Sequence, residues 1–413
     1  MLSLRAAARR SIGASTSTPS SRLIHTQTVT DDDIARLAAQ PLHALTLADL
    51  CQHGRPPLSP AALLRSAHFT LALLPARLAH RIQALRRLPY IVVANPHVHR
   101  IHAHYVHSLS TLLPYAEPRE DGGADGGGSG RLVTSADELR FTDVMADLVR
   151  THAHTIAVLA KGFLEARRYI RADEVTRFLD EHLRARIGTR LIAEQHIALH
   201  LSSVGQQHDP AAQDSFVGVI DTALRPAEIV RACEHTVGEI CELQYGVRPT
   251  VDIVGAPDTT IAHVPMHLTY VLTELLKNAF RATIEAGMQR CPVEVTIAPA
   301  PVPPQSSPSS SAAAAHADIR PLETGSPGVT VRIRDRGGGV APEALGRLWD
   351  YGFTTFNEEQ VRDAGGSSLA GLGYGLPLGR AYAEYFGGGI AVQSLWGWGT
   401  DVYLSLRGVG RVD

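Results

Sequence analysis

The sequence predicts two domains, a bundle of helices followed by an α/β sandwich with a mixed sheet. A chain of 413 residues is long enough for about two domains of ordinary size, and its 44% apolar residues can supply two cores. From about residue 44 to 205 the apolar residues recur at helical spacing. From about residue 215 to 408, alternating apolar and polar stretches are mixed with helical ones. This change of period predicts a domain boundary between the two ranges.

The first domain is predicted to be a four-helix-type bundle. Helical apolar stripes cover residues 59–88, 136–169 and 173–201. Ser59 before Pro60 is typical of a helix start, because proline fits the first helical turn. The glycine-rich segment 121–130 is expected to be a flexible loop between helices.

The second domain is predicted to be a mixed sheet covered by one layer of helices. Alternating strands are predicted at 250–254, 293–297, 329–335 and 401–406, and helices at 226–244, 264–286 and 377–386. The glycines and tryptophans of 396–399 predict the turn of a closing hairpin. Residues 299–327 are rich in Pro, Ser and Ala and are expected to be a disordered insertion between two strands.

The first thirty residues have the composition of a mitochondrial transit peptide. They contain Arg5, Arg9, Arg10 and Arg22, many small and hydroxylated residues, and no acidic residue. A disordered basic tail is the alternative, and a secretory signal is disfavoured because no sufficient apolar segment follows the arginines. The four cysteines lie far apart and are expected to be reduced thiols, as in a mitochondrial matrix.

Bulk charge and hydropathy exclude two classes of protein. Of the 39 basic side chains, four lie in the first thirty residues, which contain none of the 41 acidic ones. The rest of the chain therefore has more acidic than basic side chains, and its net charge is negative. A nucleic-acid-binding protein needs a basic surface, and we therefore expect no nucleic-acid partner. No run of about 18 apolar residues occurs, so no membrane span is expected.

The segment 271–283 carries the strongest functional signal. At helical spacing Glu274, Asn278 and Arg281 form one polar stripe with Lys277 beside it. The rest of the helix is apolar and is expected to be buried, through Val271, Leu272, Leu275, Leu276 and Ala279. The chain has only two lysines, so Lys277 in this stripe gives mild further support. A carboxylate, an amide and two cations on one face suit a magnesium-bound nucleotide and the activation of a nucleophile.

Three glycine-containing motifs follow this helix. Asp335, at the end of a predicted strand, precedes Gly337 and Gly339, and an aspartate there can accept a hydrogen bond from an amine. The segment 371–377 is a glycine-rich loop that leads into a helix, which is an anion site in many proteins. Thr400 begins the last strand, where its hydroxyl could reach a purine. The loop fits neither a P-loop nor a dinucleotide-binding fingerprint.

The order and spacing of these motifs resemble those of the Bergerat-fold ATPases, which include gyrase, mismatch-repair ATPases and sensor histidine kinases. Within that superfamily, the chain resembles the mitochondrial 2-oxo-acid dehydrogenase kinases. The matching runs are 74–81, 187–190, 265–283, 335–339, 353–355 and 380–386. The resemblance covers about residues 44–408 without the two low-complexity segments. Signatures of the eukaryotic-type protein kinases are absent.

The resemblance implies a serine kinase that uses ATP and Mg²⁺. Glu274 would be the general base, Lys277 and Arg281 its charged neighbours, and Asn278 a ligand of Mg²⁺. Asp335 would bind the adenine amine in a pocket shaped by Gly337, Gly339 and Thr400. The phosphates would lie at the loop 371–375 beneath a mobile lid, about residues 356–370. The other implied nucleotide-binding residues are Thr354, Thr355, Gly371, Leu372, Gly373, Tyr374, Gly375 and Leu376.

Other interpretations remain open. A histidine kinase would need a phosphoacceptor histidine beside an acidic residue, and only His208 precedes one, in a predicted loop. A Bergerat-fold ATPase module without kinase activity would use the same polar helix. The histidines of 97–107 and the pair His196 and His200 could suggest a metal, but no suitable carboxylate or thiolate accompanies them. The first group is expected to be solvated near a helix start, and the pair to be structural.

Within the family, the branched-chain 2-oxo-acid complex is preferred over the pyruvate complex as substrate. Tyr270 stands where the pyruvate branch usually has a histidine that orients the base, and 353–355 reads Phe-Thr-Thr instead of Tyr-Ser-Thr. The sequence ends at Asp413, shortly after the last strand, without a long tail. The resemblance further implies a decarboxylase subunit as substrate, docking of the helical domain onto a lipoyl domain, a homodimer, and a regulatory 2-oxo-acid pocket in the bundle.

Overall fold

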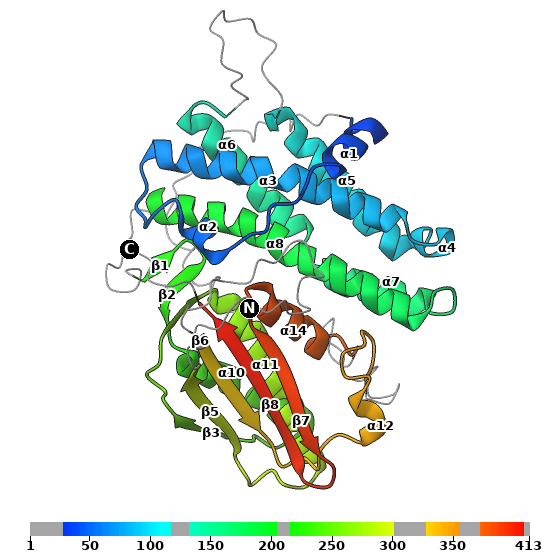
Figure 1. The fold of residues 1–413 in the computed structure, drawn as a ribbon, viewed down its shortest axis with the longest axis vertical. Coiled ribbons are helices and arrows are strands. Elements are labelled where there is room, and N and C mark those ends of the chain that lie inside the picture. The colour runs from blue at the N-terminus through cyan, green and yellow to red at the C-terminus, as the bar shows by residue number, and fades with distance from the viewer. Residues whose placement is uncertain (1–27, 117–131, 205–214, 301–327, 355–371, 409–413) are drawn as a thin grey trace, which may run out of the picture.

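The computed structural model describes residues 28–116, 132–204, 215–300, 328–354 and 372–408. Figure 1 shows a helical domain stacked on an α/β domain. The predicted loop 121–130 and the predicted lid 356–370 lie outside the described residues, as do nearly all of the predicted transit peptide and the insertion 299–327. Among the helices of the described part, none is both long and apolar enough to cross a membrane.

The helical domain confirms the predicted bundle. Its helices are α1 (Asp31–Ala38), α2 (Leu47–Cys51), α3 (Pro60–Arg86), α4 (Tyr90–Val93), α5 (Pro96–Ala116), α6 (Ser135–Thr151), α7 (Thr155–Ala166) and α8 (Ala172–Val204). The Ser59 side chain caps α3 by accepting from the Ala62 N–H at 3.3 Å, as the Ser-Pro pair predicted. The long helices α3, α5, α6 and α8 pack around one apolar core that includes Leu78, Tyr105 and Phe141.

One predicted helix of the bundle is divided. The pattern over 136–169 forms two helices, α6 and α7, with a turn at 152–154 between them. The carbonyl of His152 accepts from the Thr155 hydroxyl at 3.0 Å and from the Arg186 guanidinium on α8 at 3.1 Å. This carbonyl also accepts from the Thr155 N–H at 3.3 Å, so it is satisfied within the turn and by α8, which an apolar stripe alone does not reveal.

The α/β domain confirms the predicted mixed sheet. In their order across the sheet, its strands are β3 (Val251–Gly255), β5 (Val293–Pro299), β6 (Gly328–Arg334), β8 (Gly399–Arg407) and β7 (Gly389–Leu395). β3 and β5 are parallel, and the other neighbours are antiparallel. The hairpin between β7 and β8 turns at 396–398, as predicted. A small second sheet has β1 (Phe216–Val217), β2 (Ile220–Leu224) and β4 (Ile261–His263). β1 and β4 are too short to show a pattern, and β2 reads Ile-Asp-Thr-Ala-Leu, which does not alternate.

One face of the large sheet is covered by helices α10 (Pro226–Tyr245), α11 (Pro265–Glu285) and α14 (Gly375–Tyr385) (Figure 1). A short helix, α12 (Pro342–Leu345), follows β6. Leu272, Leu276 and Phe280 of α11 are fully buried against the apolar side of the sheet. Helix α14 packs both on β7 and on α8 of the bundle, so it connects the two domains.

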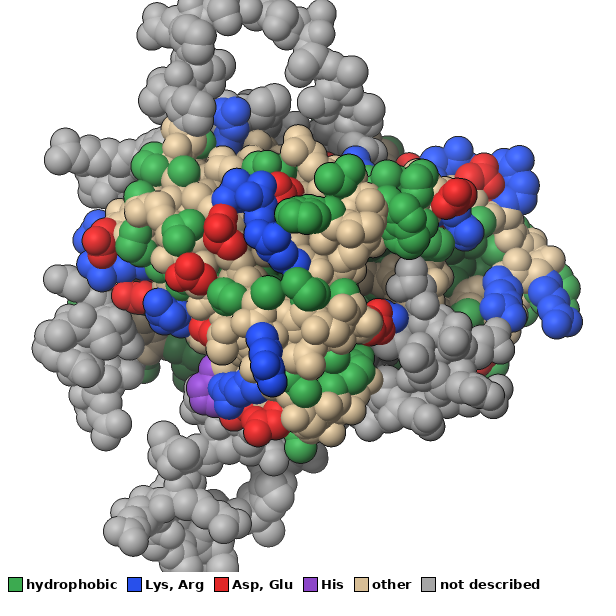
Figure 2. Space-filling view, turned by 90° about the horizontal axis from the view of Figure 1, so that it is seen from below, with side chains coloured by type: hydrophobic (Ala, Val, Ile, Leu, Met, Phe, Trp, Pro, Cys, Tyr) green, Lys and Arg blue, Asp and Glu red, His purple; other side chains and the backbone are tan. Residues whose placement is uncertain are grey.

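The far end of the α/β domain is chemically mixed. Figure 2 views this end from below, and acidic, basic and apolar side chains lie interspersed over the visible face. Leu395, Trp396 and Trp398, at the turn of the β7–β8 hairpin, are exposed. The guanidinium of Arg336 lies 5.0 Å from the ring centre of Trp398, which holds the loop after β6 against this hairpin.

Candidate active site

Helix α11 presents its polar stripe as the sequence predicted. Val271, Leu272, Leu275, Leu276 and Ala279 are buried, and the polar residues lie on the remaining face. The Lys277 ammonium donates to Glu274 Oε1 at 2.8 Å, and both side chains are mostly shielded from solvent. This contact fixes the orientation of the carboxylate.

The Glu274 carboxylate lies against the first residue of α14. A Cβ atom added at Gly375 would stand 2.2 Å from Glu274 Oε2, so a side chain there would push the carboxylate aside. The free backbone N–H groups and the dipole of a helix N-terminus favour negative charge. The structure therefore brings the polar helix and the glycine-rich segment together.

The other two members of the stripe have different surroundings. Asn278 is exposed, and within the described part of the chain its amide has no hydrogen-bond partner, so its oxygen can serve a ligand. Arg281 donates from Nε to Glu285 on the same helix at 2.6 Å. That ion pair directs Arg281 along α11 toward its C-terminal end.

Asp335 is buried at the end of β6. Its Oδ1 atom accepts from the Gly337 N–H at 2.8 Å and from the Thr400 N–H at 3.3 Å. Burial raises the pKa of Asp335, and these two hydrogen bonds oppose the rise. With both bonds on one oxygen, Oδ2 remains a free acceptor among the described residues. A buried acceptor of this kind suits the exocyclic amine of a purine.

The loop after Asp335 meets α11 at the far end of the polar stripe. A Cβ atom added at Gly337 would stand 2.4 Å from the Cβ of Ala282, which is one turn beyond Asn278. Gly339 has a φ of 75°, a left-handed conformation that glycine adopts readily. The stripe from Glu274, beside the α14 N-terminus, to Ala282, beside the Asp335 loop, spans about 12 Å at 1.5 Å per residue.

A cavity of about 340 Å³ opens at this end of the sheet, lined by Asp335, Ser394 and Thr400 among others. Ser394 was not predicted as a site residue. Its hydroxyl accepts from the Val340 N–H at 2.7 Å and lies 3.2 Å from the Thr400 hydroxyl. The hairpin register, which pairs Ser394 with Thr400 across the turn, is the signal that could have found it.

The other described residues predicted to bind the nucleotide lie in or near two segments, 351–354 and 372–376, that pack together at the start of α14. The Gly352 N–H donates to the Gly373 carbonyl at 3.2 Å, and the rings of Tyr351 and Tyr374 are 5.4 Å apart. These contacts bring Thr354 and Leu372 into the same region, while Leu376 packs on the core of the α/β domain. Thr355 and Gly371 lie outside the described residues.

Tyr270 lies one helical turn before Glu274. Its ring is 5.1 Å from that of Tyr382 on α14. Burial is the largest cause that raises the pKa of Tyr270 well above its ordinary value, and the nearby Glu274 carboxylate adds to it. The Tyr270 hydroxyl therefore keeps its proton throughout the physiological range.

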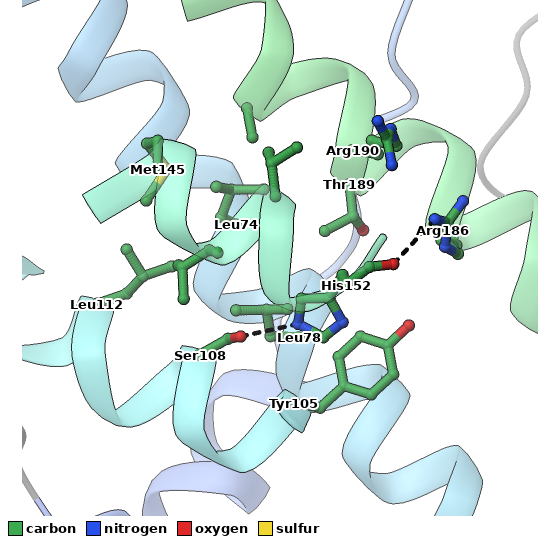
Figure 3. Close-up of a pocket in the computed structure, with 13 residues that line it drawn as sticks. Leu74, Leu78, Tyr105, Ser108, Leu112, Met145, His152, Arg186, Thr189 and Arg190 are labelled. Atoms are coloured by element: carbon green, nitrogen blue, oxygen red, sulfur yellow. Dashed lines mark hydrogen bonds between the residues drawn. The ribbon is translucent and has the colours of Figure 1, made fainter. Parts of the chain in front are cut away.

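A second cavity of about 50 Å³ lies inside the bundle, between α3, α5, α6 and α8 (Figure 3). Most of its lining is apolar, but Arg186 and Arg190 of α8 reach it from one side and His152 lies below them. The Ser108 hydroxyl and His152 Nε2 are 2.8 Å apart. Burial is the main cause that lowers the pKa of His152 to about 3, so the imidazole is neutral.

Of the histidines that could have suggested a metal, His99 and His107 are exposed, and the pair His196 and His200 is buried. Within the described residues, no group of three or more potential ligands has the arrangement of a metal site. His196 is hydrogen-bonded to the hydroxyls of Ser66 and Thr142, each at 3.0 Å, and His200 contacts the Glu138 carboxylate at 2.9 Å. The predicted structural role of this pair is confirmed.

Comparisons with known proteins match both domains. Residues 44–221 match the family described as mitochondrial branched-chain alpha-ketoacid dehydrogenase kinase, and residues 263–409 match the histidine kinase-, DNA gyrase B- and HSP90-like ATPases. The second match confirms the predicted Bergerat fold.

The similar proteins include mitochondrial pyruvate dehydrogenase (acetyl-transferring) kinases. The Saccharomyces cerevisiae kinase 1 is 30% identical over 383 residues, which cover 91% of this chain and 86% of that protein. The Arabidopsis thaliana kinase is 29% identical, with 92% and 94% covered, and isozyme 4 of Rattus norvegicus is 29% identical, with 81% and 74% covered. Both the motifs and this full-length similarity show that the chain belongs to the family of mitochondrial 2-oxo-acid dehydrogenase kinases, as its sequence predicted.

Proposed function

We propose that this chain is a protein serine kinase that transfers the γ-phosphoryl group of Mg–ATP to the decarboxylase subunit of a 2-oxo-acid dehydrogenase complex. One observation carries the proposal. The Glu274 carboxylate lies at the N-terminus of α14, on a helix that also carries Asn278 and that meets the Asp335 loop at its other end. A nucleotide along α11 would have its adenine at Asp335 and its phosphates beside Glu274.

The residues of the site can supply what phosphoryl transfer needs. Such transfer depends on positioning and on neutralising charge on the phosphates, with a base to accept the hydroxyl proton. Glu274 is ion-paired to Lys277 at 2.8 Å and can accept the proton of a serine placed before it. Asp335 and Thr400 would fix the base of the nucleotide. The glycine-rich turn and the N–H groups of α14 would bind its phosphates.

Asn278 is the residue proposed to hold Mg²⁺. Its exposed amide oxygen is a hard ligand without another partner among the described residues, which suits a cation that prefers oxygen. The cation would neutralise phosphate charge. Lys277 forms an ion pair with Glu274 and would hold its carboxylate toward the serine. Arg281 is paired with Glu285 and would not be needed for this.

Two features of the site support the branched-chain complex as the preferred substrate. Tyr270 occupies the position before the base, and Phe353 with Thr354 forms the turn that packs on Gly373. The pyruvate complex is the second candidate, because the full-length relatives are named for it. The protein would act in the mitochondrial matrix as a homodimer, with its helical domain docked on a lipoyl domain of the complex.

The cavity in the bundle is proposed to be the regulatory 2-oxo-acid site. Arg186 is 6% exposed and has no carboxylate partner among the described residues. A buried guanidinium without a counter-ion is costly, so the site favours a small carboxylate. Leu74, Leu112 and Met145 on the opposite side would accept the apolar end of such a ligand.

The proposal is tested with purified protein and both dehydrogenase complexes. Wild-type protein should transfer ³²P from ATP to a serine of one decarboxylase subunit, and the complex that is labelled faster identifies the substrate. Glu274→Gln removes the base with little change in shape, so transfer should fall at least about a hundredfold while ATP binding persists. Release of free phosphate without a labelled acceptor, or a labelled histidine, would instead support the ATPase or histidine-kinase alternatives.

A further inference from the structure

Three hydrogen bonds fasten the loop after β6 to the β7–β8 hairpin. The Gly338 N–H donates to the Trp398 carbonyl at 3.3 Å, and the Gly397 N–H donates to the Gly338 carbonyl at 2.8 Å. The third bond ends on a side chain, because the Val340 N–H donates to the Ser394 hydroxyl at 2.7 Å. The Ser394 oxygen is therefore an acceptor in this bond, and its single proton remains to be donated elsewhere.

Ser394 shares a face of the sheet with Thr400. The register of the hairpin pairs the two residues across β7 and β8. Because side chains alternate between the two faces of a sheet, Ser394 points to the same side as Ile390, and Thr400 to the same side as Leu404, which both belong to the apolar core under the helices. Asp335 joins this row, since its Oδ1 atom accepts from the Thr400 N–H at 3.3 Å.

The proton of Ser394 has two acceptors within reach in the described part of the chain. The Thr400 hydroxyl oxygen lies 3.2 Å away and the Gly399 carbonyl 3.5 Å away, so the contact with Thr400 is the closer one. If Ser394 donates to Thr400, the proton of Thr400 is not used between the two hydroxyls. Among the described residues the Thr400 hydroxyl has no other partner, so this proton is available to a ligand.

This direction of donation gives the pocket a defined pattern for a base. Asp335 Oδ2 is an acceptor and Thr400 becomes a donor. Adenine has the matching arrangement, because its amine donates and the ring nitrogens beside it, N1 and N7, accept. Guanine has a carbonyl in place of the amine, and that carbonyl would face the Asp335 carboxylate.

We propose that Ser394 is a positioning residue for recognition of adenine. It donates to the Thr400 hydroxyl, so that Thr400 donates to a ring nitrogen of the base beside the amine held by Asp335. The inference rests on the proposed function, which places adenine at Asp335. Ser394 takes no part in moving the phosphoryl group or the proton of the serine. Its loss should therefore change the affinity for the nucleotide and leave kcat nearly unchanged.

The test uses the full-length protein and four variants. Ser394→Ala removes the hydroxyl, Ser394→Thr keeps it, and Thr400→Val removes the proposed donor with little change in shape. Ser405→Ala is the matched control, because Ser405 is an exposed serine of the same sheet, on β8. The probes are the magnesium complexes of ATP, 1-deaza-ATP and 7-deaza-ATP. Each analogue keeps the amine and lacks one of the two ring nitrogens. Binding is measured by calorimetry, and kcat and KM for ATP are measured alongside.

Wild type, Ser394→Thr and Ser405→Ala should bind one of the two analogues about tenfold more weakly than ATP, because the Thr400 proton is then left without an acceptor. In Ser394→Ala the freed Thr400 hydroxyl can turn to another acceptor, so this ratio should fall to about threefold or less. The KM for ATP should rise in this variant while kcat stays within about twofold of wild type. Thr400→Val should bind ATP and both analogues alike.

A purely structural role of Ser394 gives a different result. If the hydroxyl only anchors the loop, Ser394→Ala weakens ATP and both analogues by the same factor and the ratio stays at its wild-type value, which overturns the proposal. A wild-type protein that binds both analogues as tightly as ATP overturns it as well. The proposed function fails separately, because absence of a labelled serine in the transfer assay is independent of the ratios measured by calorimetry.

Discussion

At the scale of single residues, the site depends on close approaches that the sequence shows only in part. The stripe of Glu274 and Asn278 could be predicted, because the buried face of α11 repeats every three to four residues. Asp335 could be predicted because it ends an alternating strand. Ser394 was missed, because its role follows from the hairpin register that sets it opposite Thr400.

The approach of Gly375 to Glu274 gives a prediction at this scale. In Gly375→Ala the new methyl group would overlap Glu274 Oε2, which lies 2.2 Å from the ideal Cβ position. The carboxylate must move, so kcat for transfer should fall by about tenfold or more. The thermal midpoint should change little, because alanine is favourable in a helix.

Gly379→Ala on the same helix is the matched control. Its new Cβ would be 3.7 Å from Ile390 Cδ1, an ordinary contact. Alanine there should preserve kcat and raise stability by up to about 1 kcal/mol. If both variants reduce kcat equally, the contact between Gly375 and Glu274 is not what matters for the rate.

At the scale of helices and strands, the spacing of apolar residues predicted the elements themselves well and their mutual packing poorly. The long helices of the bundle and four strands of the sheet came directly from periodicity. The turn at 152–154 escaped prediction because it is held by a local bond from Thr155 and a tertiary bond from Arg186, which an apolar stripe does not show. The packing of α14 on α8 escaped as well, since the apolar pattern of one helix does not say which other element it will contact.

The ion pair between α8 and α14 gives the prediction for this scale. The Arg184 side chain is 10% exposed and bonds Asp180 at 2.8 Å and Glu384 on α14. Arg184→Ala leaves Glu384 with Arg380 alone, and loss of such charged hydrogen bonds should lower the free energy of unfolding by about 2 kcal/mol. The measurement is chemical denaturation followed by circular dichroism.

Arg150 supplies the comparison for this variant. It forms an ion pair with Asp147 on the surface of α6, where the arginine side chain is 77% exposed. Arg150→Ala should cost less than about 0.5 kcal/mol, because exposed pairs are weak. If the two substitutions lower the free energy of unfolding equally, the ion pair between α8 and α14 contributes no more to stability than an exposed pair.

At the scale of the whole molecule, buried imidazoles make the fold sensitive to acid. Burial is the main cause that lowers the pKa of His196 and His263 to about 4 and of His152 and His267 to about 3. Burial also lowers the pKa of His182 well below its ordinary value. In the unfolded chain each of these groups would titrate near its ordinary pKa of about 6.5.

The sign of the effect follows from proton binding. Between pH 6.5 and 4 the unfolded chain binds protons at these histidines and the native protein does not, so stability falls as the pH falls. Unfolding at pH 5 should therefore take up about one proton for each of the five histidines, and the denaturation midpoint should drop steadily below pH 6.5. Glu138, whose pKa is lowered by the facing His200 against the opposing effect of burial, adds a further loss only below pH 4.5. A midpoint that stays constant from pH 7 to 5 would mean that the imidazoles are already charged in the native core.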